Sequence, residues 1–329
     1  MKIGYLGAGT WGFALAAILA NNGHQVVVWT RDPAFAAQLQ KRRVHPKLPG
    51  IEAPNTIHFT SDLSQALHGA EAIVESVTSS GIRPVFEQVG PVQVPIILTS
   101  KGIEQGTGLL LPEVVSSLMG VEESPLVGCL SGPSHAEDII LNLPTSVVCS
   151  AYNPSVMKTI HELFTTPTFR IYPNGDIRGV CFGGAMKNII AIACGIADGL
   201  GCGDNTKAAL MTRGLHEIRK LCTVKQCRPE TLNGLSGMGD LCVTCMSRHS
   251  RNYRFGKLLA EGFSPEGARQ KIGMAVEGIY TCVSARELGH KHQIPVPITE
   301  ASYEIIYGGL DPREAVKMLL QRAIKEEHL

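Results

Sequence analysis

Residues 1–20 read MKIGYLGAGTWGFALAAILA and decide the fold of the first half of this 329-residue chain. A short apolar run, residues 3–6, leads into three glycines with Gly-x-Gly-x-x-Gly spacing: Gly7, Gly9 and Gly12. Residues 10–20 then have the composition of a buried helix, and a second apolar run follows at residues 25–29. This order and spacing are typical of a strand-helix-strand unit that opens a doubly wound parallel sheet.

The same rhythm continues through the first half of the chain and then stops. Further β-branched runs lie at residues 73–77, 96–100, 126–131 and 146–150, separated by helical stretches, and residues 169–172 are a possible last strand. Continuous apolar strands that alternate with helices predict a parallel sheet covered on both faces. From about residue 179, helical periodicity dominates to the end. We therefore predict an α/β protein, with a Rossmann-type domain at 1–178 and an all-helical domain at 179–329.

Composition and the N-terminal residues limit the partners and the compartment. The chain is 44% hydrophobic and 18% charged, with a net charge of +1, so neither nucleic acid nor an acidic membrane is an expected partner. The first strand starts too early for a signal peptide to precede it, so we expect a cytoplasmic protein whose ten cysteines are reduced, mostly buried thiols.

Residues 179–197 are long and apolar enough to be considered as a membrane span. They are rich in glycine and alanine, and they carry Lys187 and Asn188 near their centre. A charged side chain in the middle of a span is costly. We therefore expect a buried helix and no integral membrane contact.

The glycine turn predicts a dinucleotide site. Gly7 allows the tight turn, Gly9 lets the backbone approach a pyrophosphate, and Gly12 lets the helix lie close to the strand. A bound flavin and a purely structural turn are the alternatives. Arg31 follows the second strand, where a carboxylate would hold a ribose 2′-hydroxyl and a basic residue would favour a 2′-phosphate, so NADP is favoured over NAD. Asp32 either turns toward the ribose or caps the next helix.

Residues that directly follow strands are further candidates, because ligands of open parallel sheets lie beyond the carboxyl ends of the strands. Lys101 follows residues 96–100, and the segment SGPSHAE, residues 131–137, follows the next strand. Ser134 and Glu137 also have the spacing of a capping box, which would satisfy two amides at a helix start. Both interpretations can hold together.

Lys187 is the candidate acid. It is the only Asp, Glu, Lys or Arg among residues 179–197, and none of its helical neighbours can neutralise it. A buried ammonium needs a carboxylate, a substrate oxygen or solvent. Asp240, in GMGD at residues 237–240, is the partner that we favour. The alternative is that Lys187 merely extends its charged end to solvent.

The triplet Ser250-Arg251-Asn252 precedes a short amphipathic helix whose apolar residues share one face. Hydroxyl, guanidinium and amide donors at a helix N-terminus predict a phosphate site, and a basic surface cap is the alternative.

Four cysteines and a histidine raise the possibility of zinc: Cys222, Cys227, Cys242, Cys245 and His249. The first pair lacks the tight two-residue spacing of zinc ligands, so we expect no metal.

These blocks together resemble the soluble, bacterial-type NAD(P)-dependent glycerol-3-phosphate dehydrogenases. GAGTWG, KGIE, SGPSHAED, GMGDL, HSRNYRFG and AVEG match that family's blocks in order over essentially the whole chain. The resemblance implies reduction of dihydroxyacetone phosphate to sn-glycerol 3-phosphate, a phospholipid precursor, with Lys187 as general acid/base. It implies substrate contacts at Lys101, Gly132, Ser134, Lys187, Asp240, Ser250, Arg251 and Asn252. It implies cofactor contacts at Thr10, Trp11, Arg31, Lys101, Ala136, Arg251, Ala275 and Glu277, with Arg31 in a block where the family varies.

Two other functions remain open at this point. A related two-domain dehydrogenase acting on a hydroxy acid or sugar acid would need carboxylate-binding residues in place of Ser250-Arg251-Asn252. A non-enzymatic NADP sensor would bind cofactor without turnover, and it leaves Lys187 and Asp240 unexplained. The Gly/Ala-rich helix is compatible with a homodimer, which we expect.

Overall fold

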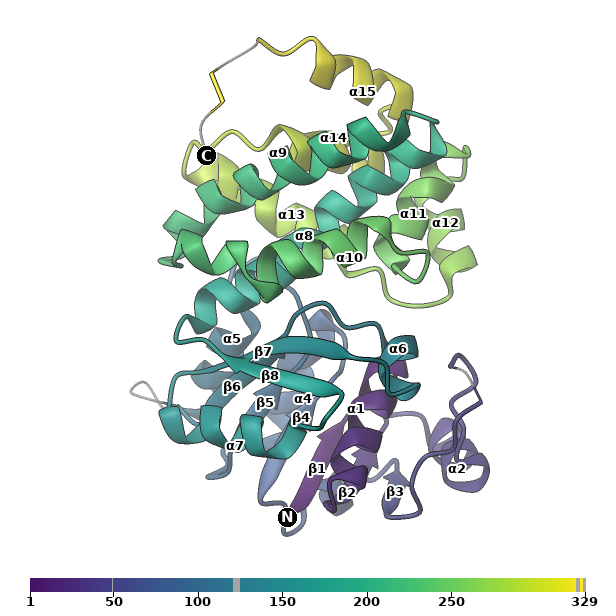
Figure 1. The fold of residues 1–329 in the computed structure, drawn as a ribbon, viewed down its shortest axis with the longest axis vertical. Coiled ribbons are helices and arrows are strands. Elements are labelled where there is room, and N and C mark those ends of the chain that lie inside the picture. The colour runs from purple at the N-terminus through teal and green to yellow at the C-terminus, as the bar shows by residue number, and fades with distance from the viewer. Residues whose placement is uncertain (49, 121–124, 324–325, 328–329) are drawn as a thin grey trace. The chain divides into compact units, whose positions relative to one another are not determined.

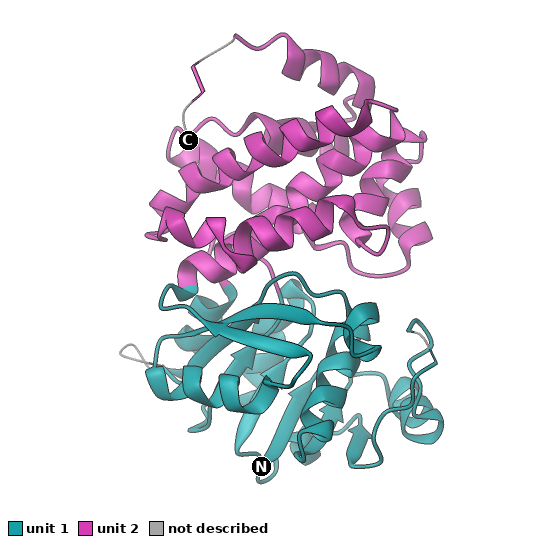
Figure 2. Cartoon of the chain, in the orientation of Figure 1, with its two compact units in different colours: residues 1–100, 111–177 teal, residues 101–110, 178–329 magenta. Residues whose placement is uncertain are grey.

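The computed structural model describes residues 1–48, 50–120, 125–323 and 326–327. The chain divides into two compact units (Figure 2). The first comprises Met1–Ser100 and Leu111–Ile177, and the second comprises Lys101–Leu110 and Arg178–Leu329. The sequence pattern predicts that residues 101–110 belong to the first domain. In the structure they fold with the second unit, which the pattern does not indicate.

The first unit is built on an eight-stranded sheet with strand order β3-β2-β1-β4-β5-β6-β7-β8 (Figure 1). Strands β1 to β6 are parallel, β7 is antiparallel to β6, and β8 is parallel to β7. The strands are β1 (Lys2–Leu6), β2 (Gln25–Trp29), β3 (Ile57–Thr60), β4 (Ala72–Glu75), β5 (Ile96–Leu98), β6 (Val127–Ser131), β7 (Thr145–Ala151) and β8 (Phe169–Pro173).

The predicted doubly wound sheet is confirmed, with two differences. Strand β3 was not predicted, because it is a four-residue edge strand whose exposed His58 interrupts the apolar run. The reversed direction of β7 was not predicted either, because a buried strand has the same composition in both directions. Here β6 and β7 are joined by a connection that contains only the five-residue helix α6 (Ala136–Ile140).

Helices cover both faces of this sheet, with α1 and α7 in front and α4 and α5 behind in Figure 1. Helix α1 is buried from Gly12 to Ala20, and its Phe13 stacks on Phe59 of β3 with ring centroids 5.9 Å apart. Besides α6, the helices of this unit are α1 (Thr10–Asn21), α2 (Pro33–Arg42), α3 (Leu63–Leu67), η1 (Ser79–Gly81), α4 (Ile82–Val89), α5 (Leu111–Met119) and α7 (Pro154–Phe164).

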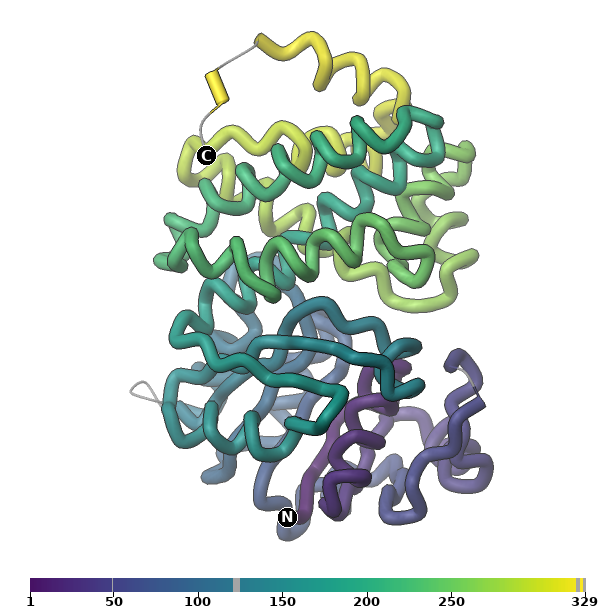
Figure 3. Tube along the Cα trace, viewed as in Figure 1, coloured from purple at the N-terminus to yellow at the C-terminus, as the bar shows by residue number. Residues whose placement is uncertain are grey.

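The second unit is helical, as predicted, and Figure 3 shows its trace as a series of helices joined by short turns. Its elements are α8 (Ile177–Gly199), α9 (Gly203–Val224), η2 (Pro229–Asn233), η3 (Leu235–Gly239), α10 (Asp240–Met246), α11 (Arg251–Ala260), α12 (Pro265–Ile272), α13 (Glu277–Lys291), α14 (Pro297–Tyr307) and α15 (Pro312–Leu320).

Helix α8 is the core of this unit. Among the described helices, only α8 is long and apolar enough to cross a membrane. However, 89% of its most apolar segment is buried within the protein, which confirms the predicted buried helix.

The glycines of α8 allow close contact with the backbone of a neighbouring helix. A Cβ built on Gly195 would lie 2.0 Å from the carbonyl oxygen of Tyr253, and one on Gly256 of α11 would lie 2.0 Å from that of Ile192. Larger side chains at these crossings would push α8 and α11 apart.

Candidate functional site

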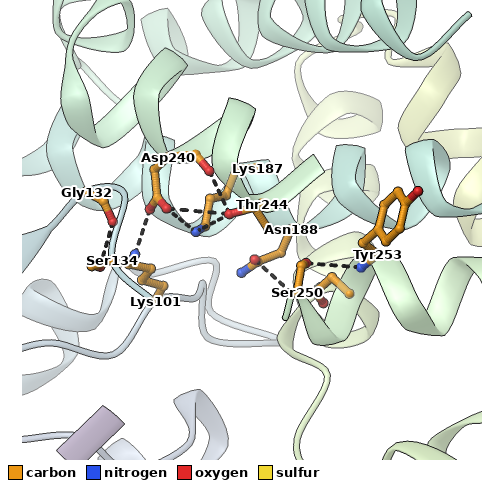
Figure 4. Close-up of polar contacts among 10 residues, drawn as sticks. Lys101, Gly132, Ser134, Lys187, Asn188, Asp240, Thr244, Ser250 and Tyr253 are labelled. Carbon is orange, nitrogen blue, oxygen red and sulfur yellow. Dashed lines mark hydrogen bonds and ion pairs between the residues drawn. The ribbon is translucent and has the colours of Figure 1, made fainter. Parts of the chain in front are cut away.

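A buried carboxylate shared by two lysines is the central feature of the second unit (Figure 4). Lys187 of α8 is 7% exposed, and its Nζ donates to Oδ1 of Asp240 and, over 2.7 Å, to Oγ1 of Thr244. Lys101 Nζ donates to the other oxygen of Asp240, Oδ2, at 2.6 Å. The structure therefore brings together three of the predicted site residues and confirms the favoured pairing of Lys187 with Asp240.

Glycines hold Asp240 in place. Asp240 begins α10, directly after the single π-helical turn η3. A Cβ on Gly237 would lie 2.1 Å from the carbonyl oxygen of Leu232, and one on Gly183 of α8 would lie 2.8 Å from that of Ser236. Only glycine permits this close approach, which brings the turn against α8 at the level of Lys187.

Thr244 is a site residue that the sequence reasoning missed. Its hydroxyl donates to the carbonyl oxygen of Asp240 at 2.6 Å and accepts from Lys187. The signal was the four-residue spacing, which puts a threonine one turn after the aspartate on the same helix face. Thr244 thus helps to fix the direction in which the Lys187 ammonium points.

Burial changes the chemistry of Lys187. Burial lowers the pKa of its ammonium to about 7, and the positive charge of Lys101 adds to this lowering, whereas the carboxylate of Asp240 opposes it. Two ammonium groups around one carboxylate also leave an excess of positive charge in a buried place. Such a cluster can attract an oxygen that carries partial negative charge and can exchange a proton near neutral pH.

Lys101 reaches Asp240 because residues 101–110 fold against the helices of the second unit. Ile103 and Leu110 form an isolated antiparallel bridge, and both side chains are buried in the core that surrounds α8. Lys225 Nζ donates to the carbonyl oxygen of Gly108 at 3.0 Å. These contacts anchor the segment whose first residue is Lys101.

The predicted phosphate-binding triplet lies at the start of α11. The Ser250 hydroxyl caps this helix by accepting from the amide of Tyr253 at 3.2 Å. Ser250 and Asn252 are buried, and Arg251 is half-buried. The triplet therefore occupies the helix N-terminus, as predicted, whereas its binding of phosphate stays a prediction.

Asn252 has structural partners that the sequence did not reveal. Its Nδ2 donates to Oδ1 of Asn188 at 2.9 Å, and its Oδ1 accepts from the amide of Gly278 at 2.9 Å. Asn188 directly follows Lys187, and Gly278 directly follows Glu277, which begins α13. Asn252 thus links the start of α11 to α8 and to the segment of the predicted cofactor residues Ala275 and Glu277.

In the first unit, the glycine turn has the geometry of a phosphate cradle. Gly7 has a φ of +111°, and a Cβ on it would lie 2.6 Å from the carbonyl oxygen of Ser76. A Cβ on Gly12 would lie 2.2 Å from the carbonyl oxygen of Gly7, whereas no atom lies within 4 Å of the Cβ position on Gly9. Gly9 is also the N-cap of α1 and has no side-chain cap. The open space at an uncapped helix N-terminus, beside Thr10 and Trp11, suits a pyrophosphate.

Asp32 caps α2, which decides between its two interpretations. Its carboxylate accepts from the amides of Ala34 and Phe35, at 2.9 and 3.2 Å. Arg31 is exposed at the end of β2. One oxygen of the Asp32 carboxylate, Oδ1, is thus used by the helix cap, and the neighbouring side chain is a cation.

The predicted capping box at Ser134 and Glu137 is wrong. Helix α6 begins at Ala136, its N-cap is His135, and no side chain caps it. The Ser134 hydroxyl instead donates to the carbonyl oxygen of Gly132 at 2.8 Å (Figure 4). The reason is Gly132, whose φ of +142° turns the chain sharply enough for the hydroxyl to reach back.

None of the ten cysteines, all in the described part of the chain, is in a disulfide. Seven are buried and three are half-buried, in agreement with the prediction of mostly buried thiols. Within the described part of the chain, no group of three or more His, Cys, Asp or Glu side chains is arranged to hold a metal ion.

Comparison with known proteins gives matches over both units. The family model for the N-terminus of NAD-dependent glycerol-3-phosphate dehydrogenase matches residues 2–157, and the model for its C-terminus matches residues 176–317. The glycerol-3-phosphate dehydrogenase [NAD(P)+] of Protochlamydia amoebophila is 59% identical over 100% of this chain and 99% of its own length. That of Chlamydia trachomatis serovar L2b is 56% identical over 99% of each chain.

Solved structures agree with these matches. The crystal structure of glycerol-3-phosphate dehydrogenase from Coxiella burnetii has a TM-score of 0.93 and 39% identity, over 98% of this chain and 99% of that chain. A ketopantoate reductase from Ralstonia eutropha shares the fold, with a TM-score of 0.63 at 14% identity over 96% of this chain and 100% of its own. On the relatives' identity over the full length, this chain belongs to the glycerol-3-phosphate dehydrogenases that use NAD(P), the family that its motifs resemble.

Proposed function

We propose that this chain reduces dihydroxyacetone phosphate to sn-glycerol 3-phosphate, with NADPH favoured over NADH, and that Lys187 is the general acid. The observation that carries the proposal is the buried Lys187 ammonium, which Asp240 and Thr244 hold in one orientation and which has a pKa near 7. Lys187 thus combines a fixed geometry with a pKa close to physiological pH.

The proton-transfer step follows from the position of Lys187. A reduced nicotinamide, when bound, supplies the hydride for the ketone carbon. Negative charge then builds on the carbonyl oxygen, where the Lys187 ammonium stabilises it and donates a proton. An N–H bond breaks, an O–H bond forms, and Lys187 is left as a neutral amine. In the reverse reaction, the neutral amine takes the proton of the alcohol.

Asp240 and Lys101 support this exchange. The Asp240 carboxylate favours the charged form of Lys187, and the Lys101 ammonium disfavours it. Burial, with a smaller contribution from Lys101, keeps the ammonium acidic enough to donate a proton, while Asp240 keeps it ion-paired. We also assign Lys101 to the substrate, because an ammonium beside the reacting oxygen adds to its stabilisation.

The phosphate group is assigned to the start of α11, with Ser250 and Arg251 as donors. Helix N-terminal amides and a guanidinium are the donors that suit a phosphate. The side-chain amide of Asn252 has two N–H groups; one donates to Asn188, and the other would complete the set. Gly132 and Ser134 stay assigned to the substrate on the resemblance. Phosphate binding would then orient the reacting carbon and raise the rate of the chemical step.

The cofactor is assigned to the glycine turn of the first unit. Residues 1–178 then form the nucleotide-binding domain, apart from residues 101–110, which fold with the substrate-binding domain at residues 179–329. Gly7, Gly9, Gly12, Thr10 and Trp11 would hold the pyrophosphate. Arg31 favours the 2′-phosphate of NADP, since Asp32 is occupied as a helix cap. Lys101, Ala136, Arg251, Ala275 and Glu277 complete the cofactor set by resemblance. We further propose a cytoplasmic homodimer.

The test is the loss of NADPH absorbance, and separately of NADH absorbance, when the purified protein meets dihydroxyacetone phosphate. Dihydroxyacetone is the control that lacks the phosphate. Fast oxidation that requires the phosphate supports the proposal. Cofactor binding without oxidation would contradict it and favour an NADP sensor.

A further inference from the structure

A cavity of about 440 Å³ lies among α8, α9, α14 and α15, and the proposed reaction makes no use of it. Its volume is within the roughly 300–1,000 Å³ typical of small-molecule sites. All of its lining residues belong to the second unit, and neither Lys187 nor Asp240 is among them. The cavity is therefore a separate feature of the helical unit.

One half of the cavity is apolar. Helix α8 contributes Ile196, α9 contributes Leu210, α14 contributes Ile305, and α15 contributes Val316 and Leu319. Three of these side chains, Leu210, Val316 and Leu319, are only half-buried and are therefore partly accessible. Covering an apolar wall of this kind with hydrocarbon removes its surface from water, which is favourable.

The other half is basic. Along α9, the lining changes from Ala209 and Leu210 to Arg213, His216 and Lys220, which the helical repeat places on one face. The lining contributed by α15 is apolar, and Arg322 follows two residues after the end of this helix. Since Arg322 interacts electrostatically with Glu217 of α9, it lies toward the basic end of α9.

The acidic residue in the lining does not neutralise this end. Glu217 accepts hydrogen bonds from the amides of Ile298 and Thr299, at 2.7 and 3.3 Å, and so caps α14. Burial raises its pKa to about 7, so its negative charge is only partial at neutral pH. Within the described part of the chain, no carboxylate oxygen lies within 4 Å of a side-chain nitrogen of Arg213, Lys220 or Arg322.

We propose that this cavity binds an amphiphilic anion with a single acyl chain. The chain would lie on Leu210, Val316 and Leu319, and the head group would lie at Arg213, Lys220 and Arg322. Charge complementarity selects an anionic head, and the apolar half selects hydrocarbon over a purely polar metabolite. A free fatty acid and a lysophosphatidate share this chemistry.

The test is isothermal titration calorimetry of the full chain below the micelle concentration, with decanoate and 1-decanoyl lysophosphatidate as probes. Decanol has the chain without the charge, and inorganic phosphate has charge without the chain. We expect saturable binding of one or both anionic amphiphiles, weaker binding of decanol, and no binding of phosphate to this cavity. The anion that binds more tightly identifies the head group.

Three variants locate the binding. The double variant Arg213→Gln/Lys220→Gln should weaken binding of the anion about tenfold and leave decanol unchanged. Ala209→Trp should fill the apolar half and abolish binding of both. Arg219→Gln, on the same helix but outside the lining, is the matched control and should change affinity less than about twofold.

Several results would overturn the proposal. They are the absence of saturable binding of either anionic amphiphile, unchanged binding in Ala209→Trp, and an equal loss in Arg219→Gln and the double variant. A change from dimer to monomer in the double variant, without any anion binding to the parent chain, would instead identify this face as an interface between copies. Thermal unfolding and dehydrogenase activity of each variant show that it is folded.

Discussion

The glycine turn of the first unit and the lysine cluster of the second are built in opposite ways. Gly7, Gly9 and Gly12 come from one short stretch, in which Gly12 packs on Gly7, and only Gly7 closely approaches a distant residue, Ser76. Lys101, Lys187 and Asp240 come from three distant segments and meet only in the folded unit. The difference teaches that a local site can be recognised from spacing, whereas an assembled site depends on every segment that delivers a residue to it.

The largest expected effect concerns the centre of the assembled site. Lys187→Ala should lower kcat about a thousandfold, because it removes the group that gives or takes the proton. Cofactor affinity should hardly change, since the glycine turn is untouched. Steady-state kinetics and a cofactor titration test this, with the exposed Lys317→Ala as control. Activity near that of the parent chain would mean that Lys187 only packs and that the acid lies elsewhere.

Asp240→Asn tests how far the cluster depends on its carboxylate. The change leaves the buried Lys187 and the half-buried Lys101 without a counter-charge, and it should lower the free energy of unfolding by about 3 kcal/mol near pH 6. It should also lower the pKa of Lys187 further. Urea denaturation measures the first effect, and Asp311→Asn, at an exposed helix cap, gives the size of an ordinary surface change. Similar losses in the two variants would remove Asp240 from its central place.

A matched pair of glycine variants tests the local site. Gly12→Ala should lower stability by about 2 kcal/mol, because its Cβ would lie 2.2 Å from a backbone oxygen. Gly9→Ala should leave stability nearly unchanged and raise the KM for the cofactor, because its Cβ would project into open space. Thermal unfolding and cofactor kinetics separate the two. Equal effects of both changes on unfolding would contradict the open space at Gly9, and an unchanged KM in Gly9→Ala would show that this space is not a cofactor site.

The pH dependence follows from the lowered pKa of Lys187. Reduction needs the ammonium, so its kcat/KM should fall as pH rises through about 7, approaching tenfold per unit above it. Oxidation needs the neutral amine, so its kcat/KM should rise over the same range. Because Asp240 favours the charged form, Asp240→Asn should move both midpoints to lower pH. Profiles that are flat between pH 6 and 8 in both directions would exclude Lys187 as the group that titrates.

The smallest expected effect is on cofactor choice. Arg31→Gln removes one exposed cation, which should lower the preference for NADPH over NADH by less than about tenfold. The ratio of kcat/KM for the two cofactors measures this, and Arg42→Gln, at the end of α2, is the control. An unchanged ratio would mean that Arg31 is a solvated loop charge and that another residue sets the preference.

Much of the fold could be predicted from the sequence, for identifiable reasons. Buried strands and a buried helix have continuous apolar runs, so six strands and α8 were evident. Strand β3 was missed because an edge strand with exposed residues lacks such a run. The capping box at Ser134 was wrong because the positive φ of Gly132 changes where the hydroxyl points, and spacing alone does not contain that angle.

Most residues of the candidate site could be predicted from the sequence, whereas most of the hydrogen bonds among them could not. Lys187 stood out as a lone charge in an apolar helix, and Asp240 stood out between glycines. Thr244 was missed, although its four-residue spacing from Asp240 was a weak signal, and Asn188 was noted only as a polar residue in an apolar run, without a partner. Their hydrogen bonds to Lys187 and Asn252 exist only once α8, α10 and α11 have packed.

The sequence by itself determined the glycine turn, the order of the two units and the identity of the lone buried lysine. These depend on backbone sterics and on the pattern of apolar residues along the chain, which are local properties. Only the tertiary structure decided that residues 101–110 join the second unit and that Lys101 and Lys187 share one carboxylate. The physical reason is that desolvation and ion pairing depend on three-dimensional proximity, which distant segments acquire only through packing.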